Sequence, residues 1–469
     1  MTVARASLSL LLACALVACG SDSGAPRIGG GGSGTSTPSQ CSLANRKAWV
    51  LDQLQEFYLF PGLLNTSVDP ASFATVQDYI NALVAPARAQ GRDRFFTYIT
   101  SIREEQELIN SGSSAGFGIR LGYDTVNGRV FVLEAFENGP AFQQGFDRGT
   151  QILSVNGVDT ATLLANGGPG NFSDALGTSA PGVNRTFRIR QPGGTESTVS
   201  VTKTEYRLDP ISDRYGAQVI DNNGTQVGYI NLRTFIVEDA GPQLRAAVNT
   251  FRQQGVTEVI LDFRYNGGGL VSVAELLGDL LARDKVGQVF SRTLVRQPPP
   301  PGLSNSTELF ESQPEAIAAT KIALIGTGAT ASASELVGNA FIPYLGNDTA
   351  LVGSNTFGKP VGQIARDREL CDDRLRVVAF RTVNAAGGGD YYDGLASVYP
   401  QTCAAEDDFL DPMGSPGEQS TATALSFLRG GSCNPINGKP EGVKQQAARL
   451  EALEATTPSA AQYRIPGLF

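Results

Sequence analysis

The sequence predicts a multidomain α+β protein in which a helical part, a β-rich part and an α/β part follow one another. With 469 residues the chain is about three times as long as a typical domain. It is 41% hydrophobic, which is enough for globular cores and excludes a wholly disordered chain. The spacing of the apolar residues changes twice along the chain, and each change marks the start of a different kind of structure.

Residues 1–18 predict an export signal. Arg5 precedes an apolar run over 8–17, which is too short to span a membrane and typical of a secretory signal. The run ends in Leu-Val-Ala-Cys-Gly, which resembles the lipobox of bacterial lipoproteins, where the cysteine, here Cys19, is lipidated and becomes the mature N-terminus. Residues 19–40 are rich in Gly, Ser, Thr and Pro, as a flexible tether would be. An ordinary signal peptide with a chance cysteine is the alternative.

These features predict a lipid-anchored protein of a bacterial cell envelope, either periplasmic or in the outer membrane. Gly20, rather than Asp, follows the cysteine, which favours the outer membrane if the source is Gram-negative. No later segment reaches 18 apolar residues, so we expect the body of the protein to be soluble.

After this leader the pattern divides the chain into four stretches. Apolar residues at three- and four-residue spacings predict a small helical domain over 41–112. Short β-rich runs between turns predict a small barrel or sandwich over 113–205. Alternating strand and helix patterns predict an α/β unit over 206–437. For residues 438–469 we expect a helix with a loose tail. In the α/β unit we expect strands at 227–232, 259–263 and 322–325, and helices at 240–251 and 270–281.

The absence of histidine restricts the possible chemistry. It removes the Ser-His-Asp triad, the Cys-His proteases and nearly all zinc enzymes, because each needs an imidazole as base or ligand. The net charge of -9 and the pI near 4.9 argue against nucleic acid as a partner. A serine can still be activated by a neutral lysine amine, provided that an apolar environment lowers the pKa of that amine.

Four cysteines remain once Cys14 leaves with the signal and Cys19 is lipidated. An exported chain is oxidised, so two disulfides are expected among them. Three connectivities are possible, and we favour Cys371 with Cys403 and Cys41 with Cys433. A redox or metal role is the lesser alternative, because no Cys-x-x-Cys spacing occurs.

Three segments of the α/β unit carry candidate chemistry. Asp262-Phe263-Arg264-Tyr265-Asn266-Gly267-Gly268-Gly269-Leu270 leads from a strand into a helix, where free N–H groups can hold a negative charge. No Gly-Lys-Ser/Thr follows, which argues against a phosphate loop. Gly328-Ala329-Thr330-Ala331-Ser332-Ala333-Ser334-Glu335 opens another helix, and 352–363 contains Lys359. Taken alone, the serines are typical of a helix cap and the lysine of a solvated turn.

The β-rich part resembles a PDZ domain. The resemblance is carried by Ala115-Gly116-Phe117-Gly118-Ile119 and by a second segment over 138–157, which is similar to the family's S-P-A-x-x-A-G-L-x-x-G-D-x-I-L-x-V-N-G. It implies that Gly116, Phe117, Gly118 and Ile119 form a loop whose N–H groups hold the carboxylate at a peptide's C-terminus, beside a strand edge that accepts the peptide. Taken singly, these glycines are more often simple turns.

The candidate segments of the α/β unit resemble motifs of the carboxyl-terminal processing (tail-specific) serine proteases. The Ser332 segment resembles their G-[ST]-A-S-A-S-E, 356–363 their T-F-G-K-G-x-V-Q, and 264–270 their R-N-N-P-G-G-L. These peptidases combine a signal, a helical N-terminal part, a PDZ domain and a crotonase-like α/β core in the order predicted here, so the resemblance covers nearly the whole mature chain.

The resemblance implies a role for each matching residue. Ser332 would be the nucleophile, Lys359 the general base, and Gln363 the residue that orients the lysine. The N–H groups of Ala333 and Gly268 would form the oxyanion hole. Ser334 and Glu335 would cap or pack the helix.

The sequence departs from the family pattern in three places. Gly267 stands where the family usually has proline, and Pro360 where it usually has glycine. Ser332 and Lys359 are also about two residues further apart than usual, which leaves Ser334 as the alternative nucleophile. We choose Ser332 because the motif around it aligns without gaps and a loop absorbs insertions easily.

The resemblance implies an exported serine endopeptidase that needs no metal or other cofactor. Its expected partners are protein or peptide substrates with accessible C-termini, recognised by the PDZ domain, and the membrane through the N-terminal lipid. Two alternatives remain: a catalytically silent relative that acts as a PDZ peptide-binding lipoprotein, and a surface adhesion or sensing module whose α/β unit binds a ligand.

Overall fold

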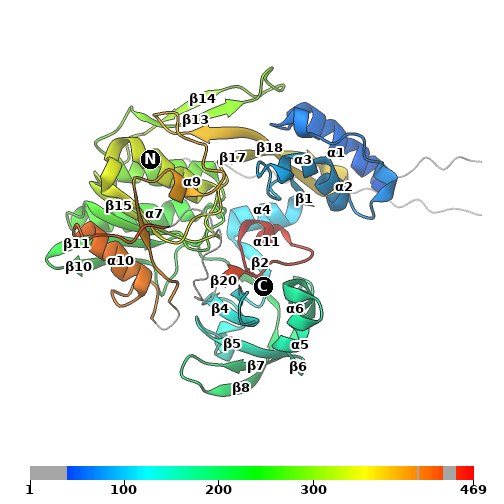
Figure 1. Cartoon of the computed structure of the whole chain (residues 1–469), viewed down its shortest axis with the longest axis horizontal. Coiled ribbons are helices and arrows are strands. Elements are labelled where there is room, and N and C mark those ends of the chain that lie inside the picture. The colour runs from blue at the N-terminus through cyan, green and yellow to red at the C-terminus, as the bar shows by residue number, and fades with distance from the viewer. Residues whose placement is uncertain (1–39, 409–410, 437–449) are drawn as a thin grey trace, which may run out of the picture. The chain divides into compact units, whose positions relative to one another are not determined.

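The computed structural model describes residues 40–408, 411–436 and 450–469, which are coloured in Figure 1. The predicted signal peptide, Cys19 and nearly all of the linker lie outside the described residues. Within these ranges no helix combines the length and the apolar character needed to cross a membrane.

A six-stranded sheet is the centre of the α/β part. Its strand order is β10-β11-β12-β15-β16-β19, and all neighbours are parallel except β10 and β11. The predicted strands at 227–232, 259–263 and 322–325 are confirmed as β11, β12 and β15. The six strands are β10 (Ala217–Asn222), β11 (Thr225–Asn231), β12 (Glu258–Asp262), β15 (Lys321–Gly326), β16 (Thr349–Gly353) and β19 (Gln401–Ala404).

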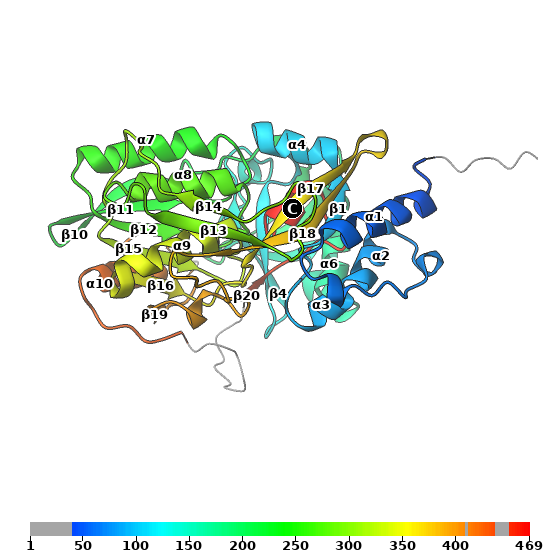
Figure 2. The ribbon, with the colours of Figure 1, turned by 90° about the horizontal axis from the view of Figure 1, so that it is seen from above.

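Helices cover both faces of this sheet (Figure 2). Three helices bury their apolar sides on one face, where Leu277 and Val337 meet Leu324. A fourth buries Leu425 against Ile325 on the other face. Two of these helices confirm the predicted ones at 240–251 and 270–281. The four are α7 (Ala240–Gln253), α8 (Val271–Leu281) and α9 (Ala333–Leu345) on the first face and α10 (Gln419–Leu428) on the second.

A second sheet joins the N-terminal helices to the α/β part. The strand β18 lies at its centre, pairing with β1, β13 and β17. Val50, Leu54 and Ile80 of the helices pack on Val377 of this sheet, so the helical part shares its core with the chain that follows Lys359. The strands are β1 (Tyr98–Ser101), β13 (Val289–Val295), β14 (Ser306–Leu309), β17 (Val361–Arg368) and β18 (Asp373–Val383), and the helices are α1 (Leu43–Phe57), α2 (Val76–Leu83), α3 (Ala85–Ala89) and α4 (Ile102–Ser111).

Residues 113–207 form a separate β-rich module, called the β module below. Its sheet has the order β3-β4-β5-β7-β8, and it buries its own apolar cluster, which includes Phe117 and Phe187. Its elements are β2 (Ser113–Gly116), β3 (Ile119–Asp124), β4 (Arg129–Ala135), β5 (Gln151–Val155), β6 (Val158–Asp159), α5 (Thr160–Ala165), α6 (Gly168–Leu176), β7 (Asn184–Arg190), β8 (Glu196–Thr202) and β9 (Thr204–Arg207).

The prediction of a loose tail at the end of the chain is wrong for the residues that the structure describes there. The strand β20 (Leu450–Ala452) pairs with β3, and α11 (Ala460–Arg464) packs on α4. Leu468 and Phe469 are buried. The segment is ordered because it buries apolar side chains and pairs with a strand edge, although it is too short to show a periodic pattern.

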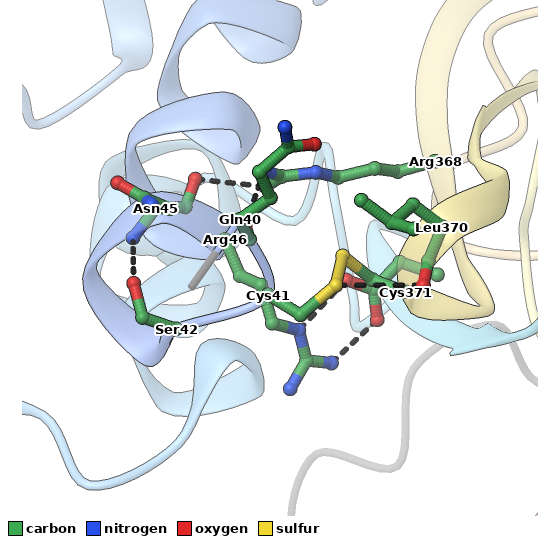
Figure 3. Close-up of a disulfide and its surroundings, with 9 residues drawn as sticks. Gln40, Cys41, Ser42, Asn45, Arg46, Arg368, Leu370 and Cys371 are labelled. Carbon is green, nitrogen blue, oxygen red and sulfur yellow. Dashed lines mark hydrogen bonds and ion pairs between the residues drawn. A yellow bond between two sulfur atoms is a disulfide. The ribbon is translucent and has the colours of Figure 1, made fainter. Parts of the chain in front are cut away.

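The favoured disulfide pairing is also wrong. The structure joins Cys41 to Cys371 and Cys403 to Cys433. Cys371 lies in the turn between β17 and β18, which reaches the start of α1, where Arg46 also pairs with Asp373 at 2.5 Å (Figure 3). The contact between α1 and this hairpin, which sequence spacing does not reveal, therefore selects the partner of Cys41.

Candidate active site

Ser332 lies at the sharp turn between β15 and α9. Its φ of 58° and ψ of -115° fall where residues with a side chain are strained, so the surroundings must hold this conformation. The N–H of the preceding Ala331 donates to Asn266 O at 3.0 Å. Ser332 itself is half-buried, and Ala333 begins α9, so the N–H of Ala333 has no acceptor within the helix. A serine hydroxyl and a free N–H donor therefore share one turn.

The other candidate serine has a structural role. Ser334 is fully buried, and its Oγ donates to Asn266 O at 2.9 Å. This bond joins the first turn of α9 to the Gly-rich loop after β12. The geometry therefore favours Ser332 over Ser334 as the nucleophile. The segment 342–348, where we expected a loop to absorb the extra spacing before Lys359, is instead helical: α9 continues to Leu345, and Gly346–Asp348 form a 3₁₀ turn.

One buried carboxylate connects the Ser332 turn to the loop that carries Lys359. Glu335 accepts hydrogen bonds from the backbone N–H groups of Ser332 (3.0 Å), Gly358 (2.7 Å) and Lys359 (2.7 Å). It also accepts from the hydroxyl of Thr356 at 2.6 Å. Burial raises the pKa of Glu335, and these four donors work against that rise. The predicted helix cap is confirmed by the bond to Ser332, whereas the bonds to the lysine loop gave no signal in the sequence.

The structure brings Lys359 together with Gln363, as the resemblance implied. Lys359 Nζ donates to Gln363 Oε1 at 2.8 Å, and Gln363 Nε2 donates to Phe96 O. The ammonium group also lies 4.9 Å from the centre of the Phe96 ring, which packs on Phe357. An apolar wall and one oriented amide thus surround the lysine head group.

This environment changes the acidity of the lysine. Burial, helped by the positive charge of Arg464 and opposed by the negative charge of Asp93, lowers the pKa of Lys359 to about 7. Near pH 7 the Lys359 amine is therefore neutral in a large fraction of the molecules. A neutral amine can accept a proton from a hydroxyl, which an ammonium cannot.

Arg464 is a site residue that the sequence did not indicate. It lies on α11, donates from Nη1 to Gln363 Oε1 at 3.3 Å, and pairs with the buried Glu105 at 2.8 Å. Although burial raises the pKa of Glu105, the guanidinium groups of Arg464 and Arg376 lower it to about 2. The last described segment of the chain therefore contributes a fixed charge beside the lysine.

The Gly-rich loop lies directly against Ser332. A Cβ added to Gly268, whose φ is 97°, would lie 2.8 Å from Ser332 Cβ and 2.9 Å from Ala333 N. The Gly268 N–H, however, donates to Asn266 Oδ1 at 2.9 Å. The predicted oxyanion donor is therefore in place, but its proton points to another acceptor.

The contact between the two predicted catalytic side chains is not made in this conformation. Among the described residues, Lys359 Nζ donates its hydrogen bond to Gln363, and no hydrogen bond joins Lys359 Nζ to Ser332 Oγ. Glu335 nevertheless holds the two backbone segments together.

A cleft of about 1220 Å³ opens at the carboxyl ends of the parallel strands. Tyr265, Thr327 and Ser354 line it after β12, β15 and β16, respectively. This end of a parallel sheet is where α/β proteins usually bind ligands. The lining also includes Ala329 and Phe357, which are close in sequence to Ser332 and Lys359. Residues of the strands β3 and β4 of the β module line the cleft as well.

Of the predicted peptide-binding residues, Gly116 ends β2, Ile119 begins β3, and Phe117 and Gly118 form the connection between them. Phe117 and Ile119 are fully buried, and Gly118 has a φ of 72°. A Cβ on Gly118 would lie 2.4 Å from Gly139 Cα, so only glycine fits there. The predicted lipid site, Cys19, lies outside the described residues. In the part of the chain that the structure describes, no group of three or more Cys, Asp or Glu side chains could hold a metal ion.

Comparisons with known proteins agree with this geometry. Residues 226–389 match the model of peptidase family S41, a span that includes Gly268, Ser332, Lys359 and Gln363. A carboxyl-terminal-processing protease of Picosynechococcus sp. is 28% identical over 270 residues, which are 56% of this chain and 59% of that protein. A carboxy-terminal processing protease of Bacillus subtilis is 24% identical over 276 residues, covering 59% and 54%. The chain thus matches a little over half the length of these curated relatives.

A solved structure shares the fold. A provisionally assigned S41 protease from Bacteroides fragilis superposes with a TM-score of 0.61 at 22% identity, over 81% of this chain and 97% of that one.

We predict that Glu335→Gln destabilises the protein by about 1–3 kcal/mol, because an amide keeps one acceptor oxygen and turns its NH₂ group toward backbone donors. Chemical denaturation checks this, with Glu369→Gln as the control, since Glu369 is exposed. Equal stabilities for the two variants would show that Glu335 does not hold the two loops.

Proposed function

The chain carries a peptidase family S41 domain, and from this premise we propose that it is a serine endopeptidase of the carboxyl-terminal processing type. Ser332 is the nucleophile, Lys359 the general base, and Gln363 orients the lysine. The observation that carries this proposal is the pair formed by a strained serine turn and a half-buried lysine, tied to each other through Glu335.

Cleavage proceeds by acyl transfer. Neutral Lys359 takes the proton of Ser332 Oγ as this oxygen attacks the carbonyl carbon of a substrate peptide bond. The C–N bond then breaks, the lysine gives its proton to the leaving amine, and the substrate's carbonyl carbon stays bound to Ser332 as an ester. Water hydrolyses the ester with the same base. The reaction needs no metal or organic cofactor.

The oxyanion is held by backbone N–H groups. Ala333 N–H is free within its helix, and Gly268 lies beside it. Because Gly268 N–H donates to Asn266 Oδ1 before substrate binds, a small rotation of the Gly-rich loop completes the oxyanion hole. The present conformation is thus a resting one, from which substrate binding assembles the site.

The β module is, in this proposal, a PDZ domain that binds substrate C-termini, and the α/β part is a crotonase-like core. Support comes from the Gly-containing segment over Gly116, Phe117, Gly118 and Ile119, which leads from β2 into β3. The module also borders the cleft above the parallel sheet. A substrate bound at β3 would therefore have the rest of its chain near the catalytic turn.

We place the enzyme in the bacterial cell envelope, periplasmic or at the outer membrane, and anchored by lipid on Cys19. The leader sequence and the Gly/Ser-rich residues after it support this assignment. The two disulfides suit an oxidising compartment. Its partners are protein substrates with unstructured C-termini.

We predict that the chain from residue 41 onward cleaves an unfolded protein ending in apolar residues. Ser332→Ala and Lys359→Ala lower kcat/KM by at least about 10³-fold, since each removes a group that acts in the transition state. Ser334→Ala, the matched control, keeps most of the activity because its hydroxyl is already bonded to Asn266 O. Mass spectrometry of the products checks this.

The same assay separates the alternatives. If the unsubstituted protein cleaves nothing and a serine-directed phosphonate does not label Ser332, the chain is a catalytically silent relative that binds peptides. If Ser334→Ala abolishes cleavage and Ser332→Ala does not, the assignment of the nucleophile is wrong.

Activity should also rise with pH, because the lysine acts as a base only when it is neutral. Since the pKa of Lys359 is lowered to about 7, kcat/KM rises about tenfold per pH unit below 7 and levels off above it. Initial rates between pH 5 and 9 check this, with circular dichroism to confirm that the protein stays folded. A profile still rising steeply at pH 9 would contradict a lowered lysine pKa.

A further inference from the structure

The edge of β3 that would receive a peptide is already covered by the chain's own residues 467–469. The N–H of Phe469 donates to Ile119 O at 2.8 Å, and the N–H of Ile119 donates to Phe469 O at 3.2 Å. The N–H of Leu121 donates to Gly467 O at 2.7 Å. Leu468 and Arg120 form an antiparallel bridge. These residues therefore form a short additional strand on β3.

The side chains of this segment fill apolar sites on alternate faces. Phe469 is 2% exposed and lies in the cluster of the β module that contains Phe117 and Ile119. Leu468 joins a different cluster, which includes Phe136. A Cβ added to Gly116 would lie 2.9 Å from Phe469 C, so the backbone of Phe469 fits closely against the start of the predicted peptide-binding loop.

The space available along β3 is short. The neighbouring part of the same edge pairs with β20, where Ala452 lies opposite Gly122. Gly467, with a φ of 77°, turns the segment away from the edge at this point, and a Cβ there would lie 2.7 Å from Leu121 O. The open stretch thus accommodates about three residues, which the segment 467–469 occupies.

We propose that residues 467–469 are an autoinhibitory ligand of the β module, which occupies the groove beside Ile119–Leu121 until a substrate segment displaces it. This inference rests on the proposed function in taking the groove as the site for substrate C-termini. A substrate must displace residues 467–469 before it can pair with this part of β3.

The segment also touches the catalytic part. Arg120 Nη1 donates to Pro466 O at 2.8 Å and to Tyr265 O at 2.7 Å, which joins the segment to the Gly-rich loop. A Cβ on Gly267 would lie 2.7 Å from Arg464 O. Arg464 itself bonds Gln363. Displacing the segment from β3 therefore loosens contacts at the Gly-rich loop and beside Lys359 together.

Peptide binding to the chain from residue 41 onward tests the proposal. The Ser332→Ala background prevents cleavage, and the probe is a fluorescein-labelled peptide Arg-Ile-Pro-Gly-Leu-Phe with a free carboxylate. Gly467→Ala strains and crowds the turn, and Phe469→Asp puts a charge in the apolar site. Each variant should therefore release residues 467–469, which otherwise compete with the probe for β3. We expect both variants to bind the probe at least about tenfold more tightly than the parent, because a tethered ligand competes at high effective concentration.

Amide exchange at Ile119 and Leu121 should speed up in both variants and slow again when the probe peptide is added. Equal probe affinity in parent and variants, with unchanged exchange at these two amides, would overturn the proposal. Labelling of Ser332 by a phosphonate, measured separately on the unsubstituted chain, reports on the peptidase proposal alone.

Discussion

The site depends on the hydrogen bonds that the carboxylate of Glu335 accepts. This carboxylate is fully buried, and its oxygens accept hydrogen bonds from the backbone of Ser332 at one end and of Gly358 and Lys359 at the other. These groups belong to a helix start and to a loop more than twenty residues later, and the N–H of Phe357 in that loop also donates to Thr330 O at 2.9 Å. A buried charge is costly unless it is satisfied, so the two loops are held in the one arrangement that satisfies it. The strained backbone of Ser332 is held by the same contacts.

A second constraint is the environment of the lysine in a chain without histidine. The groups around Lys359 come from distant parts of the sequence: Phe96 precedes β1, Gln363 lies on β17, and Arg464 ends α11. The helical N-terminal part and the C-terminal segment therefore both form part of the environment of Lys359. Arg464 also connects the lysine to the segment on β3, so one structural element contacts both the proposed peptide groove and the proposed base.

The sequence predicted what is local and periodic. The strands and helices of the α/β part follow from apolar spacing, and the turn at Ser332 from its run of small residues, whereas the pairing of Lys359 with Gln363 was implied by the family resemblance. It did not predict contacts made between distant segments. Cys371 meets Cys41 because a hairpin reaches α1, and Phe469 is buried because β3 offers a free edge. Similarly, the hydrogen bond from Gly268 to Asn266 depends on the exact path of the Gly-rich loop. None of these has a signal in residue spacing.

The central claim is that burial makes Lys359 a base near neutral pH, and a direct titration of its side chain tests it most directly. The chain has seven lysines, so a protein labelled with ¹³C at lysine Cε gives few signals, and Lys359→Arg identifies the one that belongs to Lys359. The account predicts a midpoint of about 7 for that signal. A midpoint near the usual value of about 10.4 would contradict it, because the amine would then be charged wherever the enzyme is expected to work.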